Sequence, residues 1–269
     1  MRVDNSVCIV TGAGGGIGAA LSRRLVEAGA RVVATDLDAG RLHSAVDSIA
    51  ADHPGTIVGL AGDCSADEHI RATIALAEHT FGASVDLYAA NAGVSIGADL
   101  LDSSAAAWQT SLDVNVMAHV RAAELLVPGW LERGAGHFLT TASAAGLLTQ
   151  IGSPTYSVTK HAAVAFAEWL SVTYGARGIG VSCLCPMGVD TAMLESDSTD
   201  DGAQQMIKAV TESGQVLEPL DVADLVVAAL GTDEFLILPH PEVLEFFRRK
   251  ADDYDRWLRG MRRYRDSLA

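Results

Sequence analysis

The chain has 269 residues, of which 49% are hydrophobic and 20% are charged, and it carries a formal net charge of −15. This composition allows a substantial hydrophobic core, whereas the acidic excess argues against nucleic acid or an anionic membrane surface as a partner, because both attract clusters of Lys and Arg. With no apolar run near the roughly 20 residues that span a bilayer and no signal-peptide pattern at its start, the sequence predicts a cytoplasmic protein without a membrane or nucleic-acid partner.

Short apolar runs alternate with longer amphipathic segments along the chain. The apolar runs predict strands at residues 7–11, 31–35, 57–61, 85–90, 137–141, 180–184 and 236–238. The amphipathic segments predict helices at residues 16–28, 39–51, 69–81, 105–133 and 155–174. Such alternation is typical of βαβ units. The expected fold class is therefore α/β, a doubly wound Rossmann-type parallel sheet of about seven strands with helices on both faces.

Residues 1–240 are expected to form the dinucleotide-binding and catalytic part of a single domain, because no repeat or low-complexity linker interrupts them. Residues 241–269 are expected to be an amphipathic helical extension of that domain, since Phe247, Tyr254, Trp257, Leu258 and Met261 recur at helical spacing. This helix either packs its apolar face on its own subunit or a neighbour, or covers the substrate site.

The four cysteines show no metal-binding pattern. Cys183 and Cys185 are two residues apart on a predicted strand, and neither C-x-x-C nor H-E-x-x-H occurs. We expect buried, reduced thiols and no metal site.

A glycine-rich turn, Thr11-Gly-Ala-Gly-Gly-Gly-Ile-Gly18, joins the first strand to the first helix. Glycines there permit a tight turn and let a pyrophosphate approach the helix N-terminus, as in dinucleotide sites. The run fits T-G-x-x-x-G-x-G, T-G-x-x-G-x-x-G and, from Gly14 to Ala19, G-x-G-x-x-A. The cofactor contacts predicted in this turn are Gly12, Gly15, Gly16, Ile17 and Gly18.

Asp36 follows the second strand, about 20 residues beyond the turn. A carboxylate there can accept hydrogen bonds from both ribose hydroxyls and would repel a 2′-phosphate. Neither position 37 nor the glycine turn holds Arg or Lys. The sequence therefore predicts NAD rather than NADP as the cofactor.

Tyr156 and Lys160 lie four residues apart in a predicted helix, so they share a face. With the glycine turn, this pair resembles the compact single-domain branch of the short-chain dehydrogenase/reductase family, over about residues 5–240. Further matching positions are Asp63, Asn91-Ala92-Gly93, Asn115, Ser143, which precedes Tyr156 by 13 residues, and residues 186–191. The resemblance implies the T-G-x-x-x-G-x-G form of the turn.

The chain departs from the family pattern at two positions. Ala90 stands where the family often has Asn, and Met187 follows Pro186 where it often has Gly. The second departure is expected to reshape the loop beside the nicotinamide.

The resemblance implies a catalytic set of Asn115, Ser143, Tyr156 and Lys160. Tyr156 would act as general base or acid, and Lys160, aided by the charged nicotinamide ring of NAD⁺, would lower the pKa of its phenol by about three units. Lys160 would also hold the nicotinamide ribose. Ser143 would donate a hydrogen bond to the substrate oxygen, and Asn115 would hold a water that relays protons to Lys160.

The resemblance also implies the remaining cofactor contacts. Asp63 and Cys64 would meet the adenine, and the 91–93 segment would line the adenosine. Val189 and Thr191 would hold the carboxamide, and Tyr156 and Lys160 complete the set.

The expected substrate is a hydrophobic secondary alcohol or ketone. Residues 94–96, 147–151, Met187 and a lid at 192–214 would line a largely apolar pocket. An NADP-dependent reductase of the acyl-carrier ketone type would require a basic residue near Asp36, and we expect none there. A non-catalytic NAD-binding protein would be expected to lose Ser143, Tyr156 or Lys160. By resemblance, the chain should form a homo-oligomer, a tetramer or dimer, through the helices that carry Tyr156 and Asn115.

Overall fold

The computed structural model describes residues 1–97, 99–194 and 201–268, and within them seven paired strands form one parallel sheet. The order across the sheet is β3-β2-β1-β4-β5-β6-β7. The strands are β1 (Val7–Thr11), β2 (Arg31–Asp36), β3 (Ile57–Ala61), β4 (Leu87–Ala90), β5 (Gly136–Thr141), β6 (Ile179–Leu184) and β7 (Leu236–Ile237). Because the order reverses between β1 and β4, a crevice is expected outside their carboxyl ends. The predicted Rossmann-type fold is confirmed.

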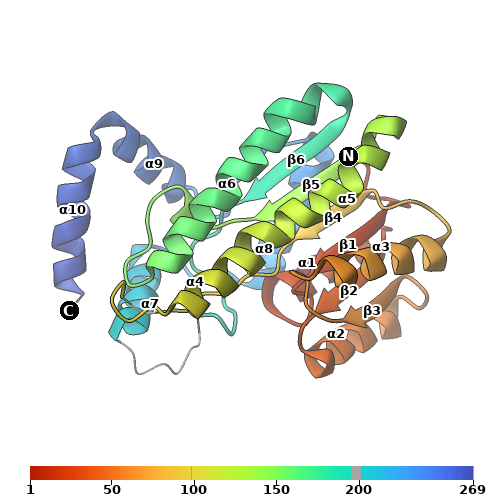
Figure 1. The fold of residues 1–269 in the computed structure, drawn as a ribbon, viewed down its shortest axis with the longest axis horizontal. Helices are drawn as coiled ribbons and strands as arrows, with labels where there is room; N and C mark the ends of the chain where they lie inside the picture. Colours follow the sequence, from red (N-terminus) through yellow and green to blue (C-terminus); the bar gives the residue numbers. More distant parts are fainter. Residues whose placement is uncertain (98, 195–200, 269) are drawn as a thin grey trace.

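Helices cover both faces of the sheet (Figure 1). One face packs against α1 (Gly16–Glu27), α2 (Ala39–Asp52) and α8 (Pro219–Thr232). The other packs against α3 (Asp67–Phe81), α5 (Ala118–Arg133) and α6 (Pro154–Tyr174), with α4 (Ala105–Leu112) leading into α5. Three further helices gather at one end of the molecule: α7 (Asp201–Ser213), α9 (Glu242–Asp252) and α10 (Tyr254–Ser267).

The central strands are buried on both faces. In β1, Val7 and Ile9 belong to one hydrophobic core, while Cys8 and Val10 belong to the other. Successive side chains of a strand point to opposite faces. A strand between two helix layers therefore needs a continuous apolar run, which is the pattern that the sequence displays.

Three helical features differ from the sequence-based expectations. Helix α8 was not predicted, although Pro219 at its first turn and the spacing of Val222, Val226 and Leu230 could have indicated it. The single helix expected at 105–133 is divided by a π-helical segment, Asp113–Met117. The C-terminal helix is two helices, and Asp253 begins the second by accepting a hydrogen bond from Arg256 N. Among the described helices, none combines the length and apolar character needed to cross a bilayer.

Candidate active site

A cavity of about 640 Å³ lies at the carboxyl ends of the central strands. All of the predicted cofactor and catalytic residues line it except Asn115, which lies behind its wall. Its volume is in the range of a typical cofactor or small-molecule site. Sequence positions spread from Gly12 to Thr191 are thus brought to one place.

The glycine turn contains positions that the protein's own packing requires to be glycine. Gly12 has φ +67°, and a Cβ on it would lie 2.9 Å from Ala92 Cα. A Cβ on Gly18 would lie 2.1 Å from Gly12 O, and one on Gly16, at φ +52°, would lie 2.9 Å from Thr191 Cγ2. A Cβ on Gly15 would meet nothing within 4 Å. The three glycines of the T-G-x-x-x-G-x-G pattern are thus constrained, and so is Gly14, whose Cβ would lie 2.9 Å from Asp36 Cγ. Gly15 instead leaves open space in the cavity wall.

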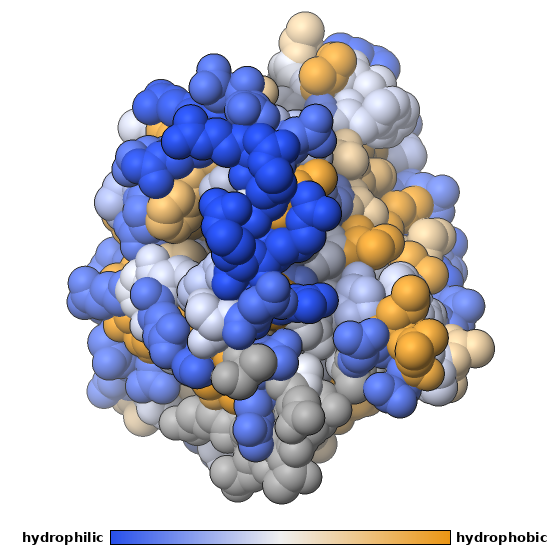
Figure 2. Space-filling view, turned by 90° about the vertical axis from the view of Figure 1, so that its left-hand side faces the viewer, coloured by the Kyte–Doolittle hydropathy of each residue, from blue (hydrophilic) through white to orange (hydrophobic). Residues whose placement is uncertain are grey.

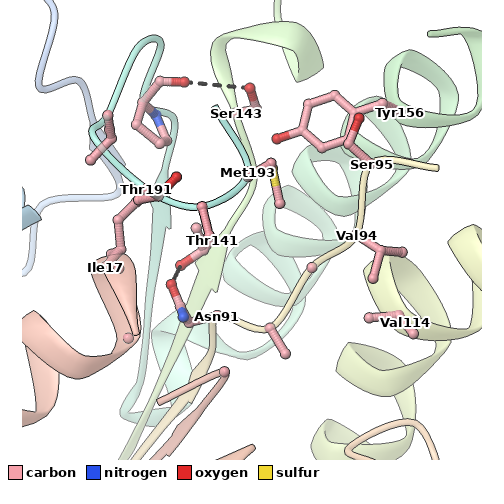
Figure 3. Close-up of a pocket in the computed structure, with 18 of the residues that line it drawn as sticks. Ile17, Asn91, Val94, Ser95, Val114, Thr141, Ser143, Tyr156, Thr191 and Met193 are labelled. Carbon is pink, nitrogen blue, oxygen red and sulfur yellow. Dashed lines mark hydrogen bonds between the residues drawn. The ribbon is translucent and has the colours of Figure 1, made fainter. Parts of the chain in front are cut away.

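The floor of the cavity is held by hydrogen bonds between strand ends (Figure 3). Asn91 Nδ2 donates to Thr11 O at 2.9 Å, and Thr141 Oγ1 donates to Asn91 Oδ1 at 3.1 Å. Thr11 Oγ1 also accepts hydrogen bonds from the backbone N–H groups of Asn91 and Ala92. These contacts join the ends of β1, β4 and β5, so Asn91 uses its side chain to fix the floor.

Asp36 is oriented by backbone donors. Its Oδ2 accepts from Gly14 N and its Oδ1 accepts from Asp38 N, both at 2.9 Å. The first turn of α2 brings Arg41 into the lining of the same cavity, where its Nε donates to Asp38 Oδ2 at 3.1 Å. The expectation that no basic residue lies near Asp36 was therefore wrong. Position 37 and the glycine turn hold no basic residue, but the first turn of α2 carries Arg41 back toward them.

The remaining predicted cofactor residues lie at the edges of the cavity. Asp63 Oδ1 accepts hydrogen bonds from the N–H and hydroxyl of Ser65, at 2.8 and 2.7 Å. Burial raises the pKa of the neighbouring Cys64 to about 12, so its thiol stays protonated. Val189 is buried and pairs with Leu217. These positions present backbone and small side chains to the cavity.

Tyr156 and Ser143 lie together at one end of the cavity (Figure 3), and Lys160 lines the same cavity. Tyr156 stands in the first turn of α6, and its hydroxyl points toward Ser143. Ser143 Oγ accepts from Ala145 N at 3.1 Å. Lys160 Nζ donates to Thr141 O at 2.9 Å and lies 5.5 Å from the centre of the Tyr156 ring.

The pKa values of this pair are set mainly by burial. Burial raises the pKa of Tyr156 above its usual value, and the nearby Ser143 hydroxyl only partly offsets this. Burial lowers the pKa of Lys160 to about 8. In the protein without cofactor the pKa of Tyr156 is thus raised, because a low-dielectric site disfavours the charged form of both groups. The lowering expected from Lys160 together with the charged nicotinamide ring stays a prediction.

Asn115 lies in the π-helical segment and is fully buried behind the end of the cavity that holds Tyr156. Its Oδ1 accepts from Val94 N at 2.8 Å, and its Nδ2 donates to Val94 O at 2.9 Å and to Thr159 Oγ1 at 3.0 Å. A Cβ on Gly93 would lie 3.1 Å from Lys160 Nζ and 3.3 Å from Asn115 Oδ1. Single π-helical turns are frequent at functional sites, and this one seats Asn115 beside the segment that passes Lys160.

His240 is a positioning residue that sequence analysis missed. It is buried, its Nδ1 accepts from Met187 N at 3.2 Å, and its Nε2 lies 2.9 Å from Gln215 O and 3.1 Å from Gly188 O. It thereby holds the loop after β6 in which Met187 departs from the family pattern. No sequence signal pairs His240 with that loop, because the contact spans about 50 residues.

The expected substrate pocket is only partly described. Residues from 94–96, Gln150, Met187 and Met193 line the cavity, as do Met206 and Val210 of α7. The expected lid at 192–214 includes residues 195–200, which lie outside the described residues. Within the described ranges, no group of three or more His, Cys, Asp or Glu side chains is arranged to hold a metal ion.

Comparison with known proteins identifies the family. Residues 6–202 match the family described as short chain dehydrogenase. A 1-deoxy-11-beta-hydroxypentalenate dehydrogenase of Streptomyces exfoliatus is 33% identical over 256 residues, which cover 94% of this chain and 90% of the relative.

Two solved structures resemble this fold. A short-chain dehydrogenase/reductase of Burkholderia phymatum in complex with NAD has a TM-score of 0.86 and 31% identity, covering 95% of this chain and 96% of that one. The L-sorbose reductase of Gluconobacter frateurii complexed with NADPH and L-sorbose has a TM-score of 0.76 and 25% identity, covering 88% and 97%. The matched sequence, the parallel sheet and the arrangement of the site agree: this chain belongs to the short-chain dehydrogenase family.

Proposed function

We propose that this protein is an NAD-dependent oxidoreductase that transfers a hydride between nicotinamide and a hydrophobic secondary alcohol or ketone. The observation that carries the proposal is one cavity with two chemically different ends. Tyr156, Ser143 and Lys160 lie at one end, and Asp36 and the glycine turn lie at the other. A dinucleotide is long enough to join such ends, with its pyrophosphate at the N-terminus of α1.

The residues present fit NAD. The open space beside Gly15 suits a pyrophosphate, because the lining there carries no side chain. The Asp36 carboxylate, oriented by two backbone N–H groups, is placed to accept ribose hydroxyls. The Burkholderia relative was solved with NAD.

Arg41 supports the alternative, NADP, because a guanidinium can pair with a 2′-phosphate, and the Gluconobacter relative was solved with NADPH.

Bound nicotinamide supplies the hydride acceptor for oxidation or the hydride donor for reduction. Ser143 would hold the substrate oxygen beside Tyr156, whose hydroxyl would take the alcohol proton or give one to the ketone oxygen. Burial keeps the phenol protonated near neutral pH, so the protein alone is prepared to donate this proton. Lys160 would place a positive charge near Tyr156 and hold the ribose, and Asn115 would hold a relay water.

An apolar substrate is supported by the lining beyond the catalytic end. Val94, Ile96, Met187, Met193 and Val210 contribute apolar side chains there. The Streptomyces relative is named as a dehydrogenase of a hydroxylated compound, 1-deoxy-11-beta-hydroxypentalenate. A small number of polar groups at one end of an apolar cavity fixes the orientation of such a molecule.

The proposal is tested by comparing Tyr156→Phe with Tyr174→Phe, a matched loss of one hydroxyl at the far end of α6. We expect Tyr156→Phe to lower kcat for alcohol oxidation with NAD at least a hundredfold while NADH affinity stays within about threefold, and Tyr174→Phe to change neither. Wild-type protein that binds NADH but turns over no secondary alcohol or ketone would favour the non-catalytic alternative. Full activity in Tyr156→Phe would exclude the catalytic assignment.

We also propose that the protein forms a homo-oligomer, a dimer or tetramer, through the outer face of α6. Val158, Trp169 and Val172 lie on one side of that helix and are 49%, 54% and 86% exposed. Apolar side chains gathered on one helical face favour an interface. Light scattering of the wild type and of Trp169→Glu tests this, because a monomeric wild type contradicts it.

A cytoplasmic location and a single domain, with residues 241–269 as its extension, remain part of the proposal. The location is supported by four free cysteines. Among them, Cys183 Sγ and Cys185 Sγ lie 3.8 Å apart without a disulfide bond. Cell fractionation tests the location, and cooperative unfolding of the whole chain tests the domain.

A further inference from the structure

A second cavity of about 680 Å³ lies beneath the two C-terminal helices, between them, α7 and the 147–151 loop. It adjoins the first cavity, because five residues line both: Ala144, Ala145, Gln150, Met187 and Val210. A molecule whose reacting carbon lies beside Tyr156 can therefore continue past Met187 and Gln150 toward α10. The combined space exceeds what a cofactor and a small alcohol require.

The inner wall of the second cavity is apolar, with Leu148, Ile151, Phe246 and Met261 among its residues. Trp257 also lines it, and its Nε1–H is buried without an acceptor among the described residues. A buried donor without an acceptor is destabilising unless something else satisfies it. The wall thus suits a hydrocarbon chain that carries a hydrogen-bond acceptor.

The wall formed by α10 has a gap between two arginines. Arg256 and Arg263 both line the cavity, two helical turns apart, and Gly260 lies between them. A Cβ on Gly260 would meet only Arg263 Nη2, at 4.0 Å, so the packing of the described residues does not require a glycine there. Glycine within a helix lowers its stability. The position instead leaves room for a ligand beside the guanidinium group of Arg263.

The charges on this cavity favour an anion at the α10 end. Among the described residues, the guanidinium groups of Arg256 and Arg263 have no ion-pair or hydrogen-bond partner, whereas Arg249 pairs with Glu245. Asp253, which also lines the cavity, accepts the N-terminal N–H of α10. Asp252 is a lining carboxylate as well. Figure 2 faces this end and shows strongly hydrophilic residues grouped over the C-terminal helices, with hydrophobic residues exposed between them.

We propose that the second cavity binds the carboxylate end of an elongated, mainly apolar hydroxy or oxo acid, with Arg256 and Arg263 as its recognition residues. This inference rests on the proposed function, since it places the reacting carbon of the same substrate beside Tyr156. The net charge of −15 does not attract anions to the protein as a whole. Selectivity for the acid must come from the two local arginines, which can bind a carboxylate through paired N–H donors.

The test compares a straight-chain fatty acid that carries a mid-chain secondary hydroxyl with its methyl ester. Binding to the NADH-bound protein is measured by calorimetry, below the concentration at which the acid forms micelles. We expect the acid to bind about tenfold more tightly than the ester. The double variant Arg256→Gln/Arg263→Gln should lose this difference. Arg259→Gln/Arg262→Gln, the matched control on exposed α10 positions outside the cavity, should keep it.

The proposal would be overturned by equal affinity for acid and ester, or by no binding of either. It would also be overturned if both double variants lost the preference for the acid, because that result indicates general surface attraction. Oxidation of a short neutral secondary alcohol with NAD is measured in parallel. It should be unchanged in Arg256→Gln/Arg263→Gln, because neither residue lines the catalytic cavity. Acid-selective binding without any such oxidation would support the anion site while contradicting the proposed function. Oxidation without acid-selective binding would support the proposed function while contradicting the anion site.

Discussion

Lys160 Nζ lies 5.5 Å from the centre of the Tyr156 ring, and both side chains belong to the first two turns of α6. Burial acts on the two groups in opposite directions, since it raises the pKa of the phenol and lowers that of the ammonium to about 8. Lys160 is 2% exposed, and its single described hydrogen bond is to Thr141 O. The folded protein thus keeps the charged ammonium group of Lys160 in a buried site. The cost of this burial to the free energy of unfolding can be measured.

Replacing Lys160 with Met should stabilise the protein relative to wild type at pH 7 by an amount that shrinks as the pH rises. Between the folded pKa of about 8 and the unfolded value of 10.5, the unfolded wild type binds more protons at this residue, so wild-type stability rises with pH. The shift of about 2.5 units corresponds to about 3 kcal/mol. Urea unfolding of both proteins at pH 7 and pH 9.5 measures the change. A stability difference that does not vary with pH would show that Lys160 keeps an ordinary pKa.

Cofactor choice should depend on opposing contributions from Asp36 and Arg41. Asp36→Ala should raise the affinity for NADPH relative to NADH about tenfold or more, because it removes a carboxylate that repels a 2′-phosphate. Arg41→Ala should shift the same ratio toward NADH. Asp47→Ala is the control, since Asp47 lies on α2 and carries the same charge but does not line the cavity. Nicotinamide fluorescence titrations give both affinities, and a wild type that prefers NADPH would contradict the NAD assignment.

Two glycines of the same turn should respond differently to alanine. Gly18→Ala should lower the free energy of unfolding by at least about 2 kcal/mol, because its Cβ would overlap the backbone at Gly12 O. Gly15→Ala should leave the stability within about 0.5 kcal/mol but weaken NADH binding, since its Cβ would enter the cavity. Thermal unfolding without cofactor and NADH titration separate the two effects. Unchanged NADH affinity in Gly15→Ala would place the pyrophosphate elsewhere.

Asn115→Leu should destabilise the protein by about 2 kcal/mol or more, because it leaves the N–H and C=O of Val94 without their partner inside the protein. If Asn115 also serves proton relay, kcat should fall much more than NADH affinity, and the pH at half-maximal activity should move. Thr159→Val is the control, because it removes one hydrogen bond to Asn115 Nδ2 and leaves the Val94 contacts in place. A variant that loses stability but keeps the wild-type kcat would limit Asn115 to a structural role.

Several parts of this fold and site could be predicted because their signals are local. The apolar runs of the strands follow from burial on both faces, and they located all seven strands within about two residues. The glycine turn and the Tyr156–Lys160 spacing also follow from contacts within a few residues. Helix α8 was missed although Pro219 begins it, and the division of the predicted helix at 105–133 by a π-helical segment has no comparable local signal.

The sequence by itself determined the fold class and the identity of the residues that meet in the cavity, because strand periodicity, turn geometry and motif spacing are properties of neighbouring residues. Only the tertiary structure decided that Arg41 faces the same cavity as Asp36, that His240 holds the loop of Met187, and that Asn115 lies behind the wall. It alone decided the direction of the Tyr156 pKa shift, since burial depends on every element packed around α6. The cavity beneath α10 is likewise a product of helices that meet only after folding.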